Sequence, residues 1–212
     1  MAVTDRTFLR ASLAIWTRRK HYRARRLKAA QKVGAKTRIA HWRRLTDQAQ
    51  YWIDRRRSQL NRAQPLRVRA FNEARKLVGV MEEGGNNRGA AVERIIHEGG
   101  GLPGQAWCGW FCAAVYKRAG SRAVEWRWGA VRLLSSVSGV KRVSTPLPGD
   151  LVRFTFDHVG LFEKDNGDGT ITSVEGNTGA TGAVSDSATG GDGVYRKIRS
   201  KSLVRDYLRV SR

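Results

Sequence analysis

The spacing of apolar residues changes at residues 146–150 (PLPGD), and this change constrains the fold more than any other feature of the sequence. Before this segment, apolar residues recur at three- and four-residue steps, which is typical of helices. After it they alternate with polar residues, which is typical of strands with one buried face. Helices that precede a group of strands predict an α+β domain, with helices first and an antiparallel sheet after them.

The second half of the chain is predicted to contain strands near residues 151–155, 158–163, 170–175, 194–198 and 207–210. Between two of these strands, residues 165–170 (DNGDGT) have a composition like that of a calcium-binding loop. They lack the spacing of calcium ligands, so a hairpin turn is the better interpretation.

The first 64 residues predict a helical extension in front of this domain. The segment 4–63 has no proline and only one glycine, Gly34, and its apolar residues follow helical spacing. Two helices joined as a hairpin at Gly34 are favoured over one long interrupted helix. Pro65 suits the first turn of a new helix, so the sequence predicts an extension over residues 1–64 and a domain over residues 65–212.

Further helices are predicted at three places before the strands. One runs from Pro65 to about Glu83, one covers residues 88–97, and one begins at Cys108 and ends at Gly120. The glycine-rich segment 99–104 separates the last two, because it cannot continue a helix.

The net charge of +22 lies mainly in the extension. Residues 1–80 hold 22 basic and 4 acidic residues, and the rest of the chain holds 18 and 14. Such an excess predicts a polyanionic partner, which could be an anionic wall polymer or a membrane surface, and less favourably a nucleic acid. Composition does not choose among them.

Segments that would direct the chain to a membrane are not evident in the sequence. No stretch approaches the roughly 20 apolar residues of a membrane span. Residues 8–16 are too few for a signal peptide and are interrupted by Arg10, so synthesis in the cytoplasm is expected. The two cysteines, Cys108 and Cys112, are four residues apart on one predicted helix, which indicates free thiols and no disulfide framework.

Cys108 has the setting of a nucleophile, because it is predicted to open a buried helix after the glycine-rich segment. A thiol reacts as a thiolate, and a helix N-terminus and a nearby imidazole are the usual means of stabilising that form. The alternative is a small apolar core residue, which is the expected role of Cys112 one turn further along. The two cysteines and His158 do not have the spacing of a metal site.

His158 is the candidate base. Apolar Val159 and Leu161 follow it and Asp157 precedes it, which would place the imidazole at the edge of a groove. The other histidines, His21, His41 and His97, fall in predicted helices and are interpreted as surface or packing residues.

Glu175 and Asn177 alternate at the end of one predicted strand, so both side chains could point to the same face with Gly176 between them. A carboxylate there would orient an imidazole, and an amide would add a hydrogen bond. A turn formed by Glu-Gly-Asn is the alternative interpretation.

Four segments follow one another along the chain: residues 105–111 (QAWCGWF), 148–152 (PGDLV), 157–161 (DHVGL) and 175–178 (EGNT). In the same order, they resemble segments of the CHAP family of cysteine peptidoglycan amidases and endopeptidases. That family has an NlpC-like, papain-like fold and is common in phage lysins and bacterial wall hydrolases. The resemblance covers about residues 66–212.

The resemblance implies roles for four residues: Cys108 as nucleophile, His158 as base and acid, Glu175 as the orienting group and Asn177 as a supporting polar group. A backbone N–H at the start of the Cys108 helix would stabilise the oxyanion. Further candidates are Gln105 as a second oxyanion donor and four tryptophans as groove-lining or core residues: Trp107, Trp110, Trp126 and Trp128.

No cofactor is implied. Some members of the family have a calcium loop of alternating acidic residues before the nucleophile, but residues 82–89 (EEGGNNRG) lack that alternation, so no metal is expected.

The function implied by the resemblance is hydrolysis of an amide bond in or next to the peptide of bacterial peptidoglycan. The enzyme would be a phage endolysin that reaches the wall after holin-type release, a virion lysin whose extension binds other virion proteins, or a bacterial enzyme. The competing hypothesis is a basic polyanion-binding or virion structural protein with an inactive domain, against which the intact Cys, His, Glu and Asn set argues.

Overall fold

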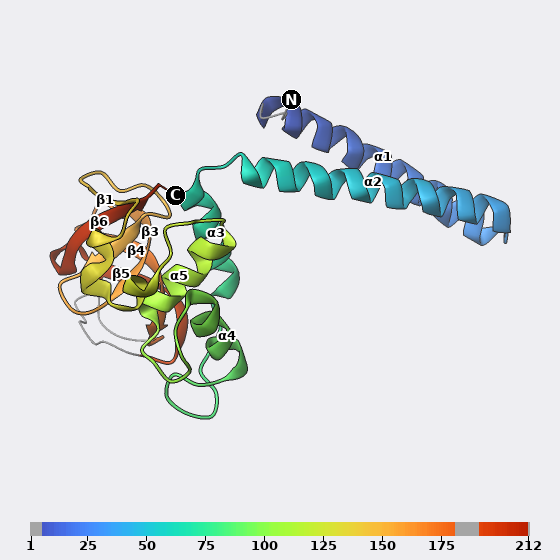
Figure 1. Cartoon of the computed structure of the whole chain (residues 1–212). Coiled ribbons are helices and arrows are strands. Elements are labelled where there is room, and N and C mark those ends of the chain that lie inside the picture. The colour runs from blue at the N-terminus through green and yellow to red at the C-terminus, as the bar shows by residue number, and fades with distance from the viewer. Residues whose placement is uncertain (1–5, 181–190, 212) are drawn as a thin grey trace. The chain divides into compact units, whose positions relative to one another are not determined.

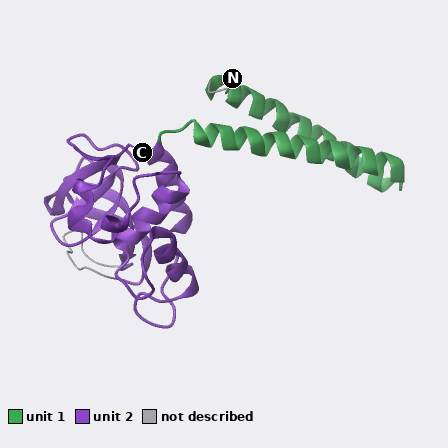
Figure 2. Ribbon diagram, viewed as in Figure 1, with its two compact units in different colours: residues 1–65 green, residues 66–212 purple. Residues whose placement is uncertain are grey.

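The structure is a computed structural model in which residues 6–180 and 191–211 are described. The chain divides into two compact units, residues 1–65 and residues 66–212 (Figure 2). Within the described ranges, each helix is too short or too polar to span a membrane.

The first unit is the expected helical hairpin, formed by α1 (Arg6–Lys32) and α2 (Lys36–Arg62) (Figure 1). Gly34 lies in the turn with a φ of +62°, a conformation that glycine adopts without steric cost. Across the hairpin, Arg23 donates to the carbonyl of Leu45 at 2.6 Å, and Arg56 donates to Ser12 Oγ at 2.9 Å. These contacts join the two helices in an antiparallel pair.

The seam of the hairpin is narrow and aromatic. Only Leu9, Ala30, Ala49 and Ile53 are buried among its described residues. The rings of Trp16 and Trp52 stack with centroids 5.7 Å apart, and several arginine guanidinium groups lie over tryptophan rings. The tryptophans therefore hold the two helices together, and most of the basic side chains lie outside the seam.

The second unit has helices followed by a six-stranded antiparallel sheet, so the predicted α+β class is confirmed. The sheet has the order β1-β6-β2-β3-β4-β5. The helices are α3 (Leu66–Leu77), α4 (Ala90–Gly99) and α5 (Cys108–Arg118), with short 3-10 helices η1 (Trp126–Gly129), η2 (Val131–Ser136) and η3 (Lys201–Leu203). The strands are β1 (Val140–Val143), β2 (Leu151–Phe154), β3 (Val159–Asp165), β4 (Thr170–Thr178), β5 (Gly193–Ser200) and β6 (Val204–Val210).

Besides the three 3-10 helices, which were not predicted, two elements differ from the sequence prediction. The strand β1 was not predicted; it is short, contains Lys141 and Arg142, and forms by pairing with β6 at the edge of the sheet. The helix α3 ends at Leu77, before the predicted end at Glu83, because Gly79 N donates to Val194 O and Met81 forms a bridge with Gly193. Contacts with β5 therefore compete successfully with the local helical pattern.

The hairpin between β3 and β4 is the turn predicted for residues 165–170. Asp165 Oδ1 accepts from Gly167 N at 2.9 Å, and Asp168 Oδ1 accepts from Thr170 N at 3.0 Å. Both carboxylates therefore stabilise the turn itself.

The helix α5 forms the centre of the core and packs against β3 and β4. Gly176 on β4 allows this approach, since a Cβ at that position would lie 2.6 Å from Phe111 Cγ. Cys112 is fully buried in the core, as expected. Burial, with the nearby charges of Cys108 and Glu175, raises the pKa of Cys112 well above its ordinary value and keeps it a thiol.

Candidate active site

Cys108 is the first residue of α5 and is almost entirely buried. The first N–H groups of a helix have no acceptor within the helix, and they carry the positive end of its dipole. The preceding residue is held in place because Trp107 Nε1 donates to Glu82 Oε1 at 2.8 Å. The thiol of Cys108 therefore lies where a negative charge is stabilised.

His158 lies in the tight connection between β2 and β3. Its N–H donates to Phe156 O at 2.7 Å, and its carbonyl accepts from Phe154 N at 3.1 Å. The imidazole stacks with the rings of both phenylalanines, at centroid distances of 5.8 Å. Its Nε2 lies 2.9 Å from Glu175 Oε2, so Nδ1 is the ring nitrogen that Glu175 leaves unoccupied. Cys108 and His158 line the same cavity.

Glu175 lies on β4 and is fully buried. Besides His158, its carboxylate accepts from Ser173 Oγ at 2.5 Å. Gly160 on β3 provides the space, since a Cβ there would lie 2.6 Å from Glu175 Cγ. The glycine that follows His158 by two residues is thus required for the approach of this carboxylate to the imidazole.

Arg199 on β5 is a functional residue that sequence reasoning missed. It is buried, and its Nη2 donates to Glu175 Oε2 at 2.8 Å and to Thr178 Oγ1 at 3.1 Å. On this strand the apolar Ile198 is 53% exposed, while the charged Arg199 faces inward. Glu175 could have indicated such a residue in the sequence, because a buried carboxylate needs a cation or several hydrogen-bond donors.

The pKa values of His158 and Glu175 are both shifted toward the charged form of the side chain. Burial would lower the pKa of His158, but the charge and hydrogen bond of Cys108 and those of Glu175 raise it to about 9. Burial would raise the pKa of Glu175, but the hydrogen bonds and charges of His158 and Arg199 lower it to about 2.

Asn177 does not continue the alternation that placed it beside Glu175. Its φ is +55°, and the register of β4 against β5 shifts between Gly176 and Thr178. The prediction of two side chains on one regular strand face was therefore wrong at this position. The described hydrogen bond of Asn177 Oδ1 is accepted from Gly191 N at 3.3 Å, not from His158.

A cavity of about 520 Å³ opens onto the reactive groups. Such a volume is in the usual range for ligand pockets. The residues that line it are Asn86, Asn87, Ala106, Cys108, Asp157, His158, Asn177 and Gly191. Asn86 and Asn87 were not predicted as site residues; they were noted only for lacking the acidic pattern of a calcium loop.

The expectation that tryptophans line the groove is wrong for Trp107 and Trp128, which are fully buried. Trp110 is nearly so, and its ring packs against Gly101 and Gly129. Trp126 is 65% exposed, but it is not among the residues that line the cavity. The indole rings of Trp107, Trp110 and Trp128 are buried in the core, because their apolar area is large.

Gln105 braces the loop before α5 and lies outside the cavity lining. Its Oε1 accepts from Leu102 N at 2.9 Å and from Trp110 Nε1 at 3.1 Å. These contacts do not favour Gln105 as an oxyanion donor, and the first backbone N–H groups of α5 are the better candidates.

Among the described residues, no three His, Cys, Asp or Glu side chains gather in a way that could hold a metal ion. In the segment 82–89, Glu82 uses Oε2 to accept from Asn87 N at 2.7 Å and Oε1 to accept from Trp107. This carboxylate therefore organises the loop beside the cavity.

The family model described as the CHAP domain matches residues 99–177. The match runs from the end of α4 to β4 and includes Cys108, His158 and Glu175. A comparison with curated proteins found no match, and a comparison with solved structures found none either.

Proposed function

We propose that this chain is a cysteine amidase or endopeptidase that cleaves an amide bond in or next to the wall peptide. The match to the CHAP domain over residues 99–177 supports this, because domains of this kind typically hydrolyse peptidoglycan. The observation that carries the proposal is that Cys108, at a helix N-terminus, lines the same cavity as His158, whose imidazole is hydrogen-bonded to Glu175.

In the proposed reaction, the thiolate of Cys108 attacks the carbonyl carbon of the amide, and the oxyanion is stabilised by N–H groups in the first turn of α5. The C–N bond breaks as the imidazolium of His158 gives its proton to the leaving amine. A thioester to Cys108 remains. Neutral His158 then takes a proton from water, the hydroxide attacks the thioester, and a carboxylic acid leaves as the thiolate re-forms.

Glu175 and Arg199 act through His158. The carboxylate accepts from Nε2, which fixes the ring with Nδ1 toward the sulfur and stabilises the imidazolium. Arg199 keeps that carboxylate ionised in a buried setting. The two side chains are positioning residues, since neither would touch the scissile bond.

The proposed activity is tested by mass analysis of the products from purified peptidoglycan. One water should be added per cut, with a new amino group and no new reducing sugar end. The masses would also identify the bond as muramoyl to L-alanine, a stem-peptide bond or a cross-bridge. New reducing ends would contradict the proposal, and wall binding without any product would support the alternative of an inactive, polyanion-binding protein.

We further propose that the hairpin of α1 and α2 attaches the enzyme to a polyanionic surface. Residues 6–62 hold 18 Arg and Lys side chains against Asp47 and Asp54. No ion pair joins described side chains of the hairpin, so these positive charges are not neutralised within it. A wall polymer or a membrane surface fits this charge, as would an acidic virion protein.

Deletion of residues 1–63 should leave a folded domain that still cuts soluble wall fragments but binds whole walls weakly. The second unit has its own core, which supports independent folding. The difference from the full chain should be large at low salt and shrink as salt rises, because exposed charges are screened beyond about 10 Å at roughly 0.1 M. Co-sedimentation with walls over a salt series measures it. An unfolded truncated protein, or equal binding at low salt, would contradict this role.

A further inference from the structure

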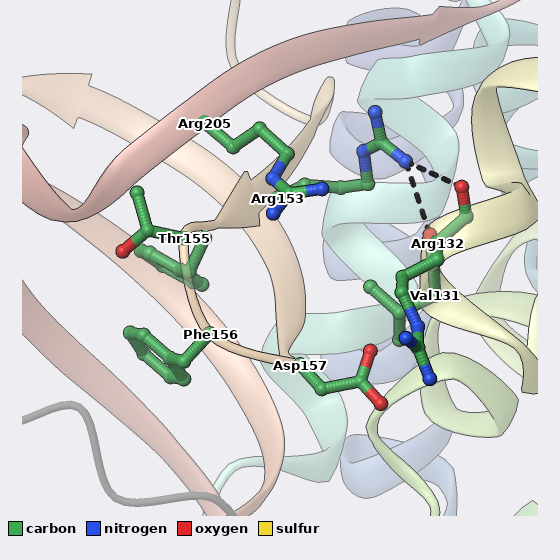
Figure 3. Close-up of a pocket in the computed structure, with 8 residues that line it drawn as sticks. Val131, Arg132, Arg153, Thr155, Phe156, Asp157 and Arg205 are labelled. Carbon is green, nitrogen blue, oxygen red and sulfur yellow. Dashed lines mark hydrogen bonds between the residues drawn. The ribbon is translucent and has the colours of Figure 1, made fainter.

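A second cavity, of about 290 Å³, adjoins the catalytic one and is drawn in Figure 3. Asp157 lines both cavities, and it directly precedes His158. The walls of the second cavity come from the end of β2, the turn after it, the start of η2 and the start of β6. The lining residues are Val131, Arg132, Arg153, Phe154, Thr155, Phe156, Asp157 and Arg205.

One of its three arginines, Arg153, is a structural residue. Its Nε and Nη2 donate to Asp206 at 2.8 and 2.6 Å. Its Nη1 donates to the carbonyls of Val131 and Arg132 at 3.2 and 3.0 Å, as the dashed lines in Figure 3 show. Arg153 therefore fixes the backbone that carries Arg132, and four of the five N–H groups of its guanidinium are used in these bonds.

The other two guanidinium groups, of Arg132 and Arg205, enter from η2 and β6 (Figure 3). On β6, Asp206 pairs with Arg153 and Val204 pairs with Phe154, which leaves Arg205 as the extra residue of a bulge. Bulges commonly redirect a side chain next to a functional site. Neither guanidinium has a hydrogen bond or ion pair with a described residue.

We infer that this cavity is a subsite for a carboxylate of the wall peptide, an inference that rests on the proposed function. Two guanidinium groups against the single carboxylate of Asp157 leave a net positive charge, which suits a monoanion. The planar fork of a guanidinium matches a carboxylate in two parallel hydrogen bonds. A stem peptide carries free carboxylates near its amide bonds, so one bound here would extend across Asp157 toward Cys108.

The test uses two forms of the same purified stem-peptide substrate, one with free carboxylates and one with these converted to carboxamides. The wild-type enzyme should show a kcat/KM about 10- to 100-fold higher for the free form, the range expected for a charge-assisted pair. The double variant Arg132→Ala/Arg205→Ala should bring this ratio close to one. Arg94→Ala, an exposed arginine on α4, is the matched control and should keep it.

Binding of both substrate forms to the Cys108→Ala protein gives a second readout that does not depend on turnover. A ratio unchanged by the double variant, or equal wild-type rates on both forms, would overturn the subsite. If neither form is cut, but the free form binds preferentially and the double variant loses this preference, the proposed activity alone is refuted. If the double variant changes only the cutting of walls that keep their phosphodiester polymers, the ligand is a phosphate and the carboxylate assignment fails.

A separate observation concerns Asn87 in the catalytic cavity. The residue is 8% exposed, and its Nδ2 donates to Gly104 O at 3.3 Å. Since that carbonyl can only accept, the amide nitrogen must face it and Oδ1 must face away. Oδ1 is buried and has no hydrogen-bond partner among the residues that the structure describes.

Asn87 also has a φ of +56°, held by the bond from its N–H to Glu82. A buried acceptor without a partner and an unusual backbone conformation both cost free energy, and together they are typical of functional sites. We propose that Asn87 Oδ1 accepts an N–H of the substrate peptide and so positions the chain beside Cys108. This second inference also rests on the proposed function.

The test compares stem-peptide substrates methylated at one amide nitrogen at a time. For one position, methylation should lower the wild-type kcat/KM about 3- to 10-fold, as expected for one hydrogen bond. Asn87→Gly, which tolerates the positive φ, should lose this penalty, and the neighbouring Asn86→Gly should retain it. A penalty that persists in Asn87→Gly, or no sensitive amide at all, would overturn the role. A substrate that is not cut in any form would instead refute the proposed activity.

Discussion

Replacement of Cys108 by alanine is expected to abolish hydrolysis of peptidoglycan while leaving the fold almost unchanged. Removal of a covalent nucleophile ordinarily costs several orders of magnitude in rate. The side chain lies at the start of α5 and lines the cavity, and alanine keeps its Cβ, so little packing is lost. The rate of product release and the melting temperature measure the two effects. A variant that keeps more than about a hundredth of the wild-type rate would contradict the covalent mechanism.

Cys112→Ser is the matched control, because it changes the other thiol one turn along the same helix. Cys112 is fully buried in the core. A hydroxyl there would lack a partner, which should cost about 1–3 kcal/mol of the free energy of unfolding. The melting temperature should fall while the rate per folded molecule stays near that of the wild type. The two variants would thus distinguish the catalytic role of Cys108 from the packing role of Cys112.

Loss of the imidazole should have the second largest effect, and loss of the carboxylate that orients it should follow. His158→Ala removes the group that moves the proton, and roughly a 10³–10⁴-fold fall in rate is expected. Glu175→Gln keeps a hydrogen-bonding side chain but removes the charge, so a smaller fall of about 10²–10³-fold is expected. Steady-state rates on soluble fragments measure both. An equal loss from Asp157→Asn and Glu175→Gln would show that the wrong acid was assigned.

The pH dependence of the same pair follows from the two pKa shifts. The pKa of His158 is raised from 6.5 to about 9, so the imidazolium and its stabilising contribution are present below 6.5 and are lost as pH rises through about 9. The pKa of Glu175 is lowered from 4.5 to about 2, so its contribution is present above 4.5 and is lost as pH falls through about 2. Activity should therefore decline above about pH 9.

Arg199→Met should move the acidic limb of the pH–rate profile upward, because it removes one of the cations that hold the pKa of Glu175 low. Arg196→Met on the same strand is the control, since its exposed ion pair with Glu163 is far less desolvated. An acidic limb that stays in place in Arg199→Met would show that His158 alone keeps the carboxylate ionised.

The sequence by itself determined the features that depend on local periodicity and on chain breakers. The helical hairpin at Gly34, the α+β order and the hairpin turn at residues 165–170 all follow from spacing within a few residues. The same holds for Cys108 at the start of α5, because the glycine-rich segment before it cannot be helical. For these elements, the backbone conformation that the local sequence favours is also the one that buries the apolar face.

The tertiary structure decided the features that depend on which strands pair and which face they bury. β1 exists only through β6, and the bulge at Asn177 directs that side chain to Gly191. Arg199 faces inward against the apolar pattern of its strand because Glu175 lies on the neighbouring strand. A buried carboxylate needs a cation, and the residue that supplies it can lie anywhere in the chain, so its identity is not written in the local sequence.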